Sequence, residues 1–191
     1  MKKSIVALFV SSLVLSNVYA FNNHLTEAQS DNVIHQIQHN NIEFLNNMVN
    51  EGFDINSNLE GDGTALIIAA RAGKATMVQA LLDLGADVNY ATETDGNPLT
   101  AATIANKLTI AKLLYLQGAE LDAITEYDET ALINASRYGH FKLVEFLVEN
   151  GADVNLSVNA QTARGIVYRS PLKNAKTQQI RDYLASKGAK V

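Results

Sequence analysis

Apolar residues recur along the chain as two adjacent positions, a gap of two residues, and two adjacent positions again. The four sets are Phe44, Leu45, Met48 and Val49; Met77, Val78, Leu81 and Leu82; Ile110, Ala111, Leu114 and Tyr115; and Leu143, Val144, Leu147 and Val148. Residues three and four apart share one face of an α-helix. The pattern therefore predicts four amphipathic helices, each with one buried stripe, at a period of 33 residues.

A glycine follows each stripe and opens a five-residue motif that twice reads GADVN. The motifs cover 52–56, 85–89, 118–122 and 151–155. We expect the glycine to end the helix with positive φ, the alanine to clear the bend, and the valine to point back into the core. A repeat of this size cannot bury its stripe alone, so it must stack on copies of itself.

A second set of helices is predicted before the stripes. They open at Thr64, Asn97 and Thr130, whose side-chain oxygens can cap the first turn. Pro98 fits the first helical position, where its missing N–H costs nothing. The turn between the two helices falls at Gly73, Asn106 and Gly139. All three residues tolerate a left-handed backbone.

These segments resemble ankyrin repeats over roughly residues 27 to 190, clearly so in TALIIAARAGKATMVQALLDLGADVN and TALINASRYGHFKLVEFLVENGADVN. The resemblance implies an all-α solenoid of about five stacked helix-turn-helix repeats with β-hairpin fingers. The expected divisions are a leader at 21–30, a capping repeat at 31–56, full repeats at 57–89, 90–122 and 123–155, and a C-terminal capping repeat at 156–191.

Both terminal repeats depart from the pattern in ways that suit end caps, whose outer faces meet water. The first carries polar Gln36 where its successors have alanine, and the last skips three residues before Lys176 and places Arg181 on the stripe. Seven extra residues lie within Leu156 to Arg169, so the last finger should be longer than its neighbours. The usual turn glycine is replaced by Asp62 and Asp128.

Residues 1–20 have the features of a cleavable export signal. Lys2 and Lys3 precede an apolar run, and Val18-Tyr19-Ala20 carries small residues where a signal peptidase cuts. The run is about half the roughly 20 residues that a membrane span needs, so an uncleaved anchor is the weaker alternative. We expect a soluble mature chain that starts at Phe21.

Charge limits the class of partner, and cysteine content bears on export. Loss of Lys2 and Lys3 leaves 13 basic against 20 acidic residues, a net charge of −7 with neutral histidines. Nucleic acid and anionic lipid are therefore poor partners, and a basic protein is a better one. The chain has no cysteine, so export into an oxidising compartment leaves no thiol to oxidise.

Candidate chemistry is sparse, and we expect neither catalysis nor a cofactor. His35 and His39 have a chelating spacing but no third ligand, which favours a surface pair over a metal site. The segment 56–61 only partly matches a calcium loop and is better explained as a hairpin turn. His140 stands where ankyrin repeats commonly carry a structural histidine. No nucleophile motif or phosphate-binding loop is present in the sequence.

The resemblance instead implies a concave protein-binding surface made by the fingers and first helices. Carried over by position, its exposed sites are Glu60, Arg71, Ala72, Ala91, Glu93, Thr94, Ile104, Ile124, Glu126, Tyr127, Glu129, Arg137, Tyr138, Tyr168 and Arg169. Tyrosine and arginine often dominate binding energy. We therefore expect the partner-binding residues to be Arg71, Glu93, Ile104, Ile124, Glu126, Tyr127, Arg137, Tyr138, Tyr168 and Arg169.

The leading hypothesis is a non-enzymatic periplasmic binding protein, monomeric when unbound. Exported bacterial ankyrin proteins are associated with immunity, in which a periplasmic protein blocks the active site of a toxin, and with support of a periplasmic enzyme such as a catalase. An acidic concave face with a long finger favours immunity. A secreted effector that binds a host protein stays an alternative.

Overall fold

The fold is taken from a computed structural model that describes residues 25–59, 61–124, 129–162 and 165–190. In chain order its elements are α2 (Glu27–Gln38), α3 (Ile42–Asn50), α4 (Ala65–Ala72), α5 (Ala75–Asp83), α6 (Pro98–Ile104), α7 (Leu108–Leu116), α8 (Ala131–Tyr138), α9 (Phe141–Glu149), β1 (Val158–Thr162), β2 (Gly165–Arg169) and α10 (Gln178–Ser186).

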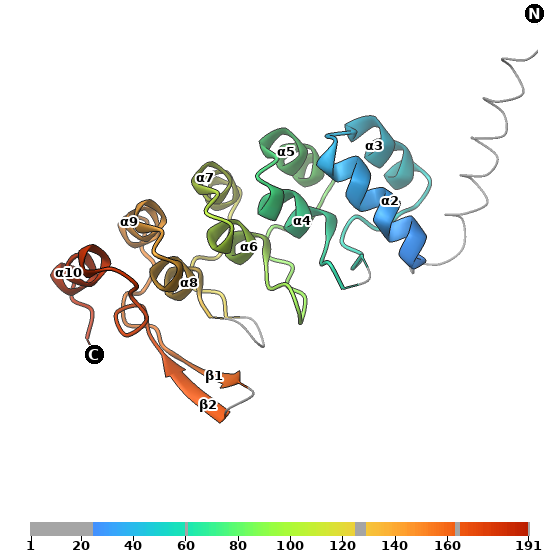
Figure 1. The fold of residues 1–191 in the computed structure, drawn as a ribbon. Coiled ribbons are helices and arrows are strands. Elements are labelled where there is room, and N and C mark those ends of the chain that lie inside the picture. The colour runs from blue at the N-terminus through green and yellow to red at the C-terminus, as the bar shows by residue number, and fades with distance from the viewer. Residues whose placement is uncertain (1–24, 60, 125–128, 163–164, 191) are drawn as a thin grey trace, which may run out of the picture.

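The helices form two layers that run side by side along the molecule (Figure 1). Helices α2, α4, α6 and α8 make one layer, in which each contacts the next. Helices α3, α5, α7, α9 and α10 make the other, where α7 packs between α5 and α9. The connecting segments and the β-strands hang from the side of the first layer, away from the second layer.

The predicted stripes form the core between these layers. Eleven inner positions of the four stripes are almost fully buried: Leu45, Met48, Met77, Val78, Leu81, Ile110, Ala111, Leu114, Leu143, Val144 and Leu147. Outer stripe members such as Val49, Leu82 and Val148 are half-buried and pack against this core. The periodicity therefore located the buried face of each second helix correctly.

The predicted caps and turns of the first helices are confirmed. The side chains of Thr64, Asn97 and Thr130 accept hydrogen bonds from backbone N–H groups three residues on, at 3.3, 2.8 and 3.2 Å. Gly73, Asn106 and Gly139 have φ of 75°, 56° and 84°. Small residues at Ala69, Ala102 and Ala135 are fully buried, which lets adjacent first helices approach closely.

The last residue of each GADVN-type motif joins its repeat to the next one. The side-chain oxygens of Asn56, Asn89, Asp122 and Asn155 accept hydrogen bonds from the backbone N–H groups of Asp87, Glu120, Asp153 and Lys190. The distances run from 2.8 to 3.1 Å. The motif therefore ends a helix, as its glycine predicts, and also holds neighbouring turns in register.

The amino-terminal repeat begins earlier than its predicted boundary at Asp31. Helix α2 starts at Glu27, and the backbone N–H of Thr26 donates to the side chain of Gln29 at 2.7 Å. Leu25 is buried against the core. Part of the segment assigned to a leader is therefore folded with the first repeat.

The carboxy-terminal repeat departs from the expected helix-turn-helix unit. Residues 170–174 form a turn rather than an α-helix, closed by a hydrogen bond from the Asn174 N–H to the Ser170 carbonyl at 3.0 Å. The three-residue deletion leaves too little chain for a first helix, so α10 covers the end of the stack alone. Arg181 is exposed on α10, where it donates to the carbonyl of Ala175.

Candidate functional site

Two connecting fingers and one longer hairpin project on the side of the first helices, and a third finger lies mostly outside the described residues. We use "fingers" for residues 57–63, 90–96 and 123–129, and "long hairpin" for residues 158–169. Single antiparallel bridges, Asn58 with Thr64 and Thr92 with Gly96, close the first two fingers. The long hairpin pairs β1 with β2 over five positions, from Val158 opposite Arg169 to Thr162 opposite Gly165. The prediction of a longer last finger is confirmed.

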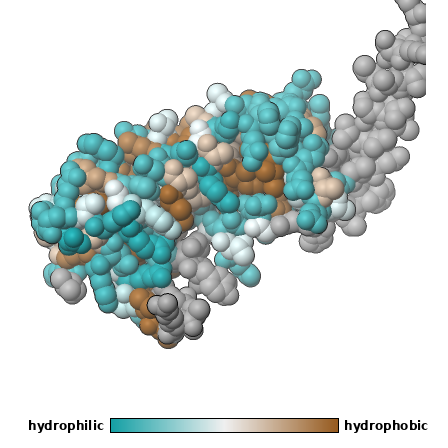
Figure 2. Space-filling view, viewed as in Figure 1, coloured by the Kyte–Doolittle hydropathy of each residue, from teal (hydrophilic) through white to brown (hydrophobic). Residues whose placement is uncertain are grey.

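The long hairpin exposes apolar side chains on β2. The exposed fractions are 69% for Ile166, 41% for Val167 and 46% for Tyr168. Because side chains alternate along a strand, Ile166 and Tyr168 share one face, and Val167 lies on the face of Arg169. Figure 2 shows hydrophobic surface on this hairpin. The Lys173 ammonium group lies 5.1 Å from the centre of the Tyr168 ring.

Arg71 joins two fingers within the protein. Its guanidinium pairs with the Asp95 carboxylate at 2.5 Å and donates to the Asp62 carbonyl at 3.2 Å. Arg71 is exposed at its position on α4, as predicted, yet two acceptors of its own chain already hold the charged group. Its role as a partner-binding residue therefore competes with a structural role.

Glu129 corrects the expected surface, because this predicted exposed site is buried. Only 2% of the residue is exposed. Its carboxylate forms ion pairs with Arg137 of α8, at 3.2 Å, and with Arg169 at the end of β2. A carboxylate without water is costly to bury unless opposite charges replace its hydration. Arg137 and Arg169, both predicted as partner-binding residues, supply those charges.

The polar group extends into α8 through Asn134, which is fully buried. Its side-chain oxygen accepts from the Arg137 guanidinium at 2.8 Å, and its side-chain nitrogen donates to the Glu129 carbonyl at 3.4 Å. The equivalent position in the second repeat is apolar Ile68. The fourth repeat therefore contributes Glu129, Asn134 and Arg137 to a buried polar cluster, completed by Arg169, whereas the second repeat has an apolar residue at the position of Asn134.

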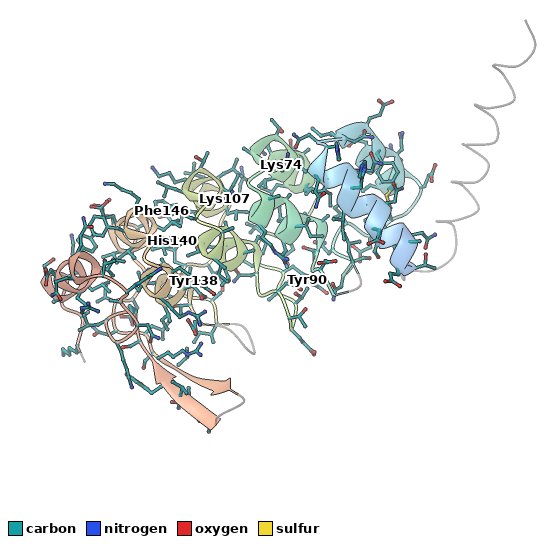
Figure 3. All side chains as sticks on the ribbon, viewed as in Figure 1. Lys74, Tyr90, Lys107, Tyr138, His140 and Phe146 are labelled. Atoms are coloured by element: carbon teal, nitrogen blue, oxygen red, sulfur yellow. The ribbon has the colours of Figure 1, made fainter. Side chains whose placement is uncertain are left out.

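Tyr138 lies beside this cluster at the end of α8. Its ring stacks on His140 at 6.0 Å and lies 4.9 Å from the Arg137 guanidinium carbon. A ring nitrogen of His140 is 3.2 Å from the Ile104 carbonyl of the preceding repeat. His140 therefore makes a contact between repeats, which agrees with the structural role expected for it. Figure 3 shows Lys74, Lys107 and His140 at the same position in three successive repeats.

Several other predicted sites are exposed, as expected from their positions. Glu93, Ile104, Ile124, Ala72, Ala91 and Thr94 all present exposed surface. Glu60, Glu126 and Tyr127 lie outside the described residues. The first helix α8 carries Tyr138, and the long hairpin projects on the side of the first helices (Figures 1 and 3).

Comparison with known proteins identifies the repeat. The family model described as Ankyrin repeats (3 copies) matches residues 9–92, 33–125 and 90–158. The chain belongs to the ankyrin-repeat family. A search of curated proteins found no match. Ankyrin repeats mediate binding to other proteins and are generally non-enzymatic, so the chain is a protein–protein interaction module.

Two features of this ankyrin surface escaped prediction from the sequence. Tyr90 is exposed and helps to line an open pocket of about 410 Å³ between fingers, together with Asn58, Gly61, Glu93 and Thr94 among others. Ile166 and Val167 are exposed on the long hairpin. Isoleucine and valine are usually buried, so residue type gives no signal for this exposure.

The residues with shifted pKa values lie on second-layer helices, away from the fingers. A hydrogen bond with Glu145 raises the pKa of Lys142 on α9, and burial raises the pKa of Tyr183 on α10. Among the described residues, no group of three or more His, Asp or Glu side chains is placed to hold a metal ion. No helix in the described ranges has the length and apolar character to cross a membrane.

Proposed function

We propose that this ankyrin protein is exported to the periplasm of a bacterium, where it binds and inhibits a toxic enzyme as an immunity protein. Two features support the proposal. The first 20 residues resemble a cleavable export signal, and an interaction module follows directly. The proposed contact surface consists of the fingers, the exposed faces of the first helices and the long hairpin.

The long hairpin is the observation that carries the inhibitory role. Five residues per strand extend it by about 17 Å, at roughly 3.4 Å a residue. Ile166, Val167 and Tyr168 expose apolar surface along it, and Tyr138 is exposed on α8. A narrow, apolar projection of this length suits insertion into a substrate cleft, whose interior is usually concave and mostly apolar.

Charge supports a basic or neutral partner over an acidic one. The mature chain carries a net charge of −7, and the three arginines predicted to bind a partner are paired with carboxylates of the same chain. Exposed Glu93 contributes negative charge to the fingers. Complementary charge chiefly speeds association and selects partners, so binding should weaken modestly as ionic strength rises.

The experiment is affinity capture from an envelope fraction with the chain from Phe21 onward as bait. The matched control bait lacks residues 160–166, which removes the seven-residue excess and leaves the helices intact. An enzyme retained by the full bait alone is then purified and assayed. Inhibition by the full bait supports immunity; a partner such as a catalase that is stabilised or activated supports the accessory role. Recovery of the chain in host cells rather than the periplasm supports a secreted effector.

A further inference from the structure

The long hairpin needs an anchor, because it projects from the stack rather than packing in it (Figure 1). Among the described elements, β1 and β2 contact each other extensively and no helix does so with either strand. A two-stranded hairpin alone is marginally stable in water. Contacts at its base must therefore decide whether it holds one direction relative to α8.

Glu129 supplies such a contact from the body of the stack. Its carboxylate is buried and is held from one side by Arg137, whose guanidinium is fixed in turn by Asn134 at 2.8 Å. On the other side it pairs with Arg169, the last residue of β2. A single buried anion thus links α8 to the strand end from which the hairpin projects.

Glu129 and Arg169 occupy the same position in two successive repeats. Glu129 stands immediately before the capping residue Thr130, and Arg169 stands immediately before Ser170. The second and third repeats carry Gly63 and Gly96 at that position, with φ of 86° and 68°. The last two repeats instead carry an acid and a base at this position, and the two side chains form an ion pair.

We propose that Glu129 is a positioning residue that fixes the orientation of the long hairpin relative to α8. Replacing the buried carboxylate by a neutral group leaves two guanidinium groups without their counter-ion, which favours release of Arg169 to water. The hairpin then moves about its base while the helical core, whose apolar contacts are separate, stays packed.

This positioning role rests on the proposed function only in its consequence for binding. A hairpin already held in its bound direction loses less conformational freedom when a partner engages it. Loss of the Glu129 anchor should therefore weaken binding of a captured partner even though the apolar contact residues remain. The orientation itself is a property of the free chain and is measured without a partner.

The test uses the natural absence of cysteine to place two spin labels cleanly. Ile166→Cys labels the exposed hairpin and Lys112→Cys labels exposed α7, and pulsed electron paramagnetic resonance gives the distribution of distances between them. The parent should show one narrow peak. Glu129→Gln and Arg169→Gln should each lose it in favour of a broad distribution, with the thermal unfolding of the helices retained.

Matched variants separate positioning from general loosening. Arg71→Gln breaks the Arg71–Asp95 pair between other fingers and should keep the narrow peak. Glu129→Asp keeps the charge and should restore part of it. If Glu129→Gln does not fold, Arg169→Gln alone decides, since Glu129 keeps Arg137. A broad distribution in the parent, or an unchanged narrow one in both glutamine variants, overturns the proposal.

Discussion

The side-chain oxygen of Asn89 accepts a hydrogen bond from the backbone N–H of Glu120, 31 residues along the chain, at 2.9 Å. The side-chain nitrogen of the same residue donates to the Gly118 carbonyl at 3.2 Å. One asparagine thus bonds one N–H and one carbonyl of the turn in the next repeat. Asn155 repeats the arrangement with Lys190 and Gly188.

Substitution of Asn89 by alanine should therefore lower stability across a repeat boundary. Two hydrogen bonds are lost, each with a net contribution of about 0.5 to 1.5 kcal/mol, so we expect a loss of about 1 to 3 kcal/mol. Urea unfolding followed by circular dichroism measures it. Asn47→Ala, at an exposed position on α3, is the control and should change stability by less than about 0.5 kcal/mol. Equal effects at the two asparagines would refute the link.

The buried stripe makes a second, larger prediction. Leu114 and Leu147 are fully buried at equivalent positions of α7 and α9, so Leu→Ala at either should cost about 2 to 5 kcal/mol. Exposed Lys112→Ala should cost under about 0.5 kcal/mol. The same urea titration compares all three variants, and similar small losses at every site would show that the stripe does not carry the core.

The buried stripes, helix caps and turns were predicted correctly because each depends on residues close together in the sequence. Stripe positions such as Leu114, caps such as Thr64 and turn residues such as Asn106 are decided by spacing and backbone preference within one repeat, which a sequence displays directly. Glu129 is different. Its burial depends on an ion pair with Arg169, which belongs to the next repeat and follows a seven-residue insertion. Its position in the family pattern alone therefore predicted an exposed side chain.

The features that the sequence did not predict, at the carboxy-terminal end and on the long hairpin, also depend on contacts beyond one repeat. The turn at Ser170 replaces a helix because the three-residue deletion shortens the segment. The deletion is visible in the sequence, but matching each position to a full repeat predicts a helix there. Ile166 and Val167 have the composition of buried strand residues, yet no second sheet or helix covers them among the described residues. Their exposure depends on where the hairpin projects.

Export makes a prediction at the amino terminus. Ala20 is the well-placed cleavage residue of the expected signal, so protein from a periplasmic extract should begin Phe-Asn-Asn-His. Edman sequencing or intact mass spectrometry reads this directly. A soluble periplasmic chain that still starts at Met1, or a chain confined to the cytoplasm, would remove the basis for an envelope function.

Partner binding should depend on exposed tyrosines more than on the paired arginines. Truncation of Tyr138 or Tyr168 to alanine should weaken binding of a captured partner by more than about 1 kcal/mol, with little change in the melting curve. Deletion of residues 160–166 should weaken it further. Calorimetric titration gives the affinities, with Lys112→Ala and Glu145→Ala on the second helices as controls. Binding lost in those controls, and kept in the tyrosine variants, would reverse the assigned face.

The most direct test of the central claim is a hydrogen-exchange footprint of the complex between the mature chain and its captured partner. If the fingers, first helices and long hairpin bind, amides in 90–96, 131–138 and 158–169 should become protected, while those in α5, α7 and α9 stay unchanged. Protection confined to α5, α7 and α9, with the long hairpin exchanging as in the free chain, would contradict the account.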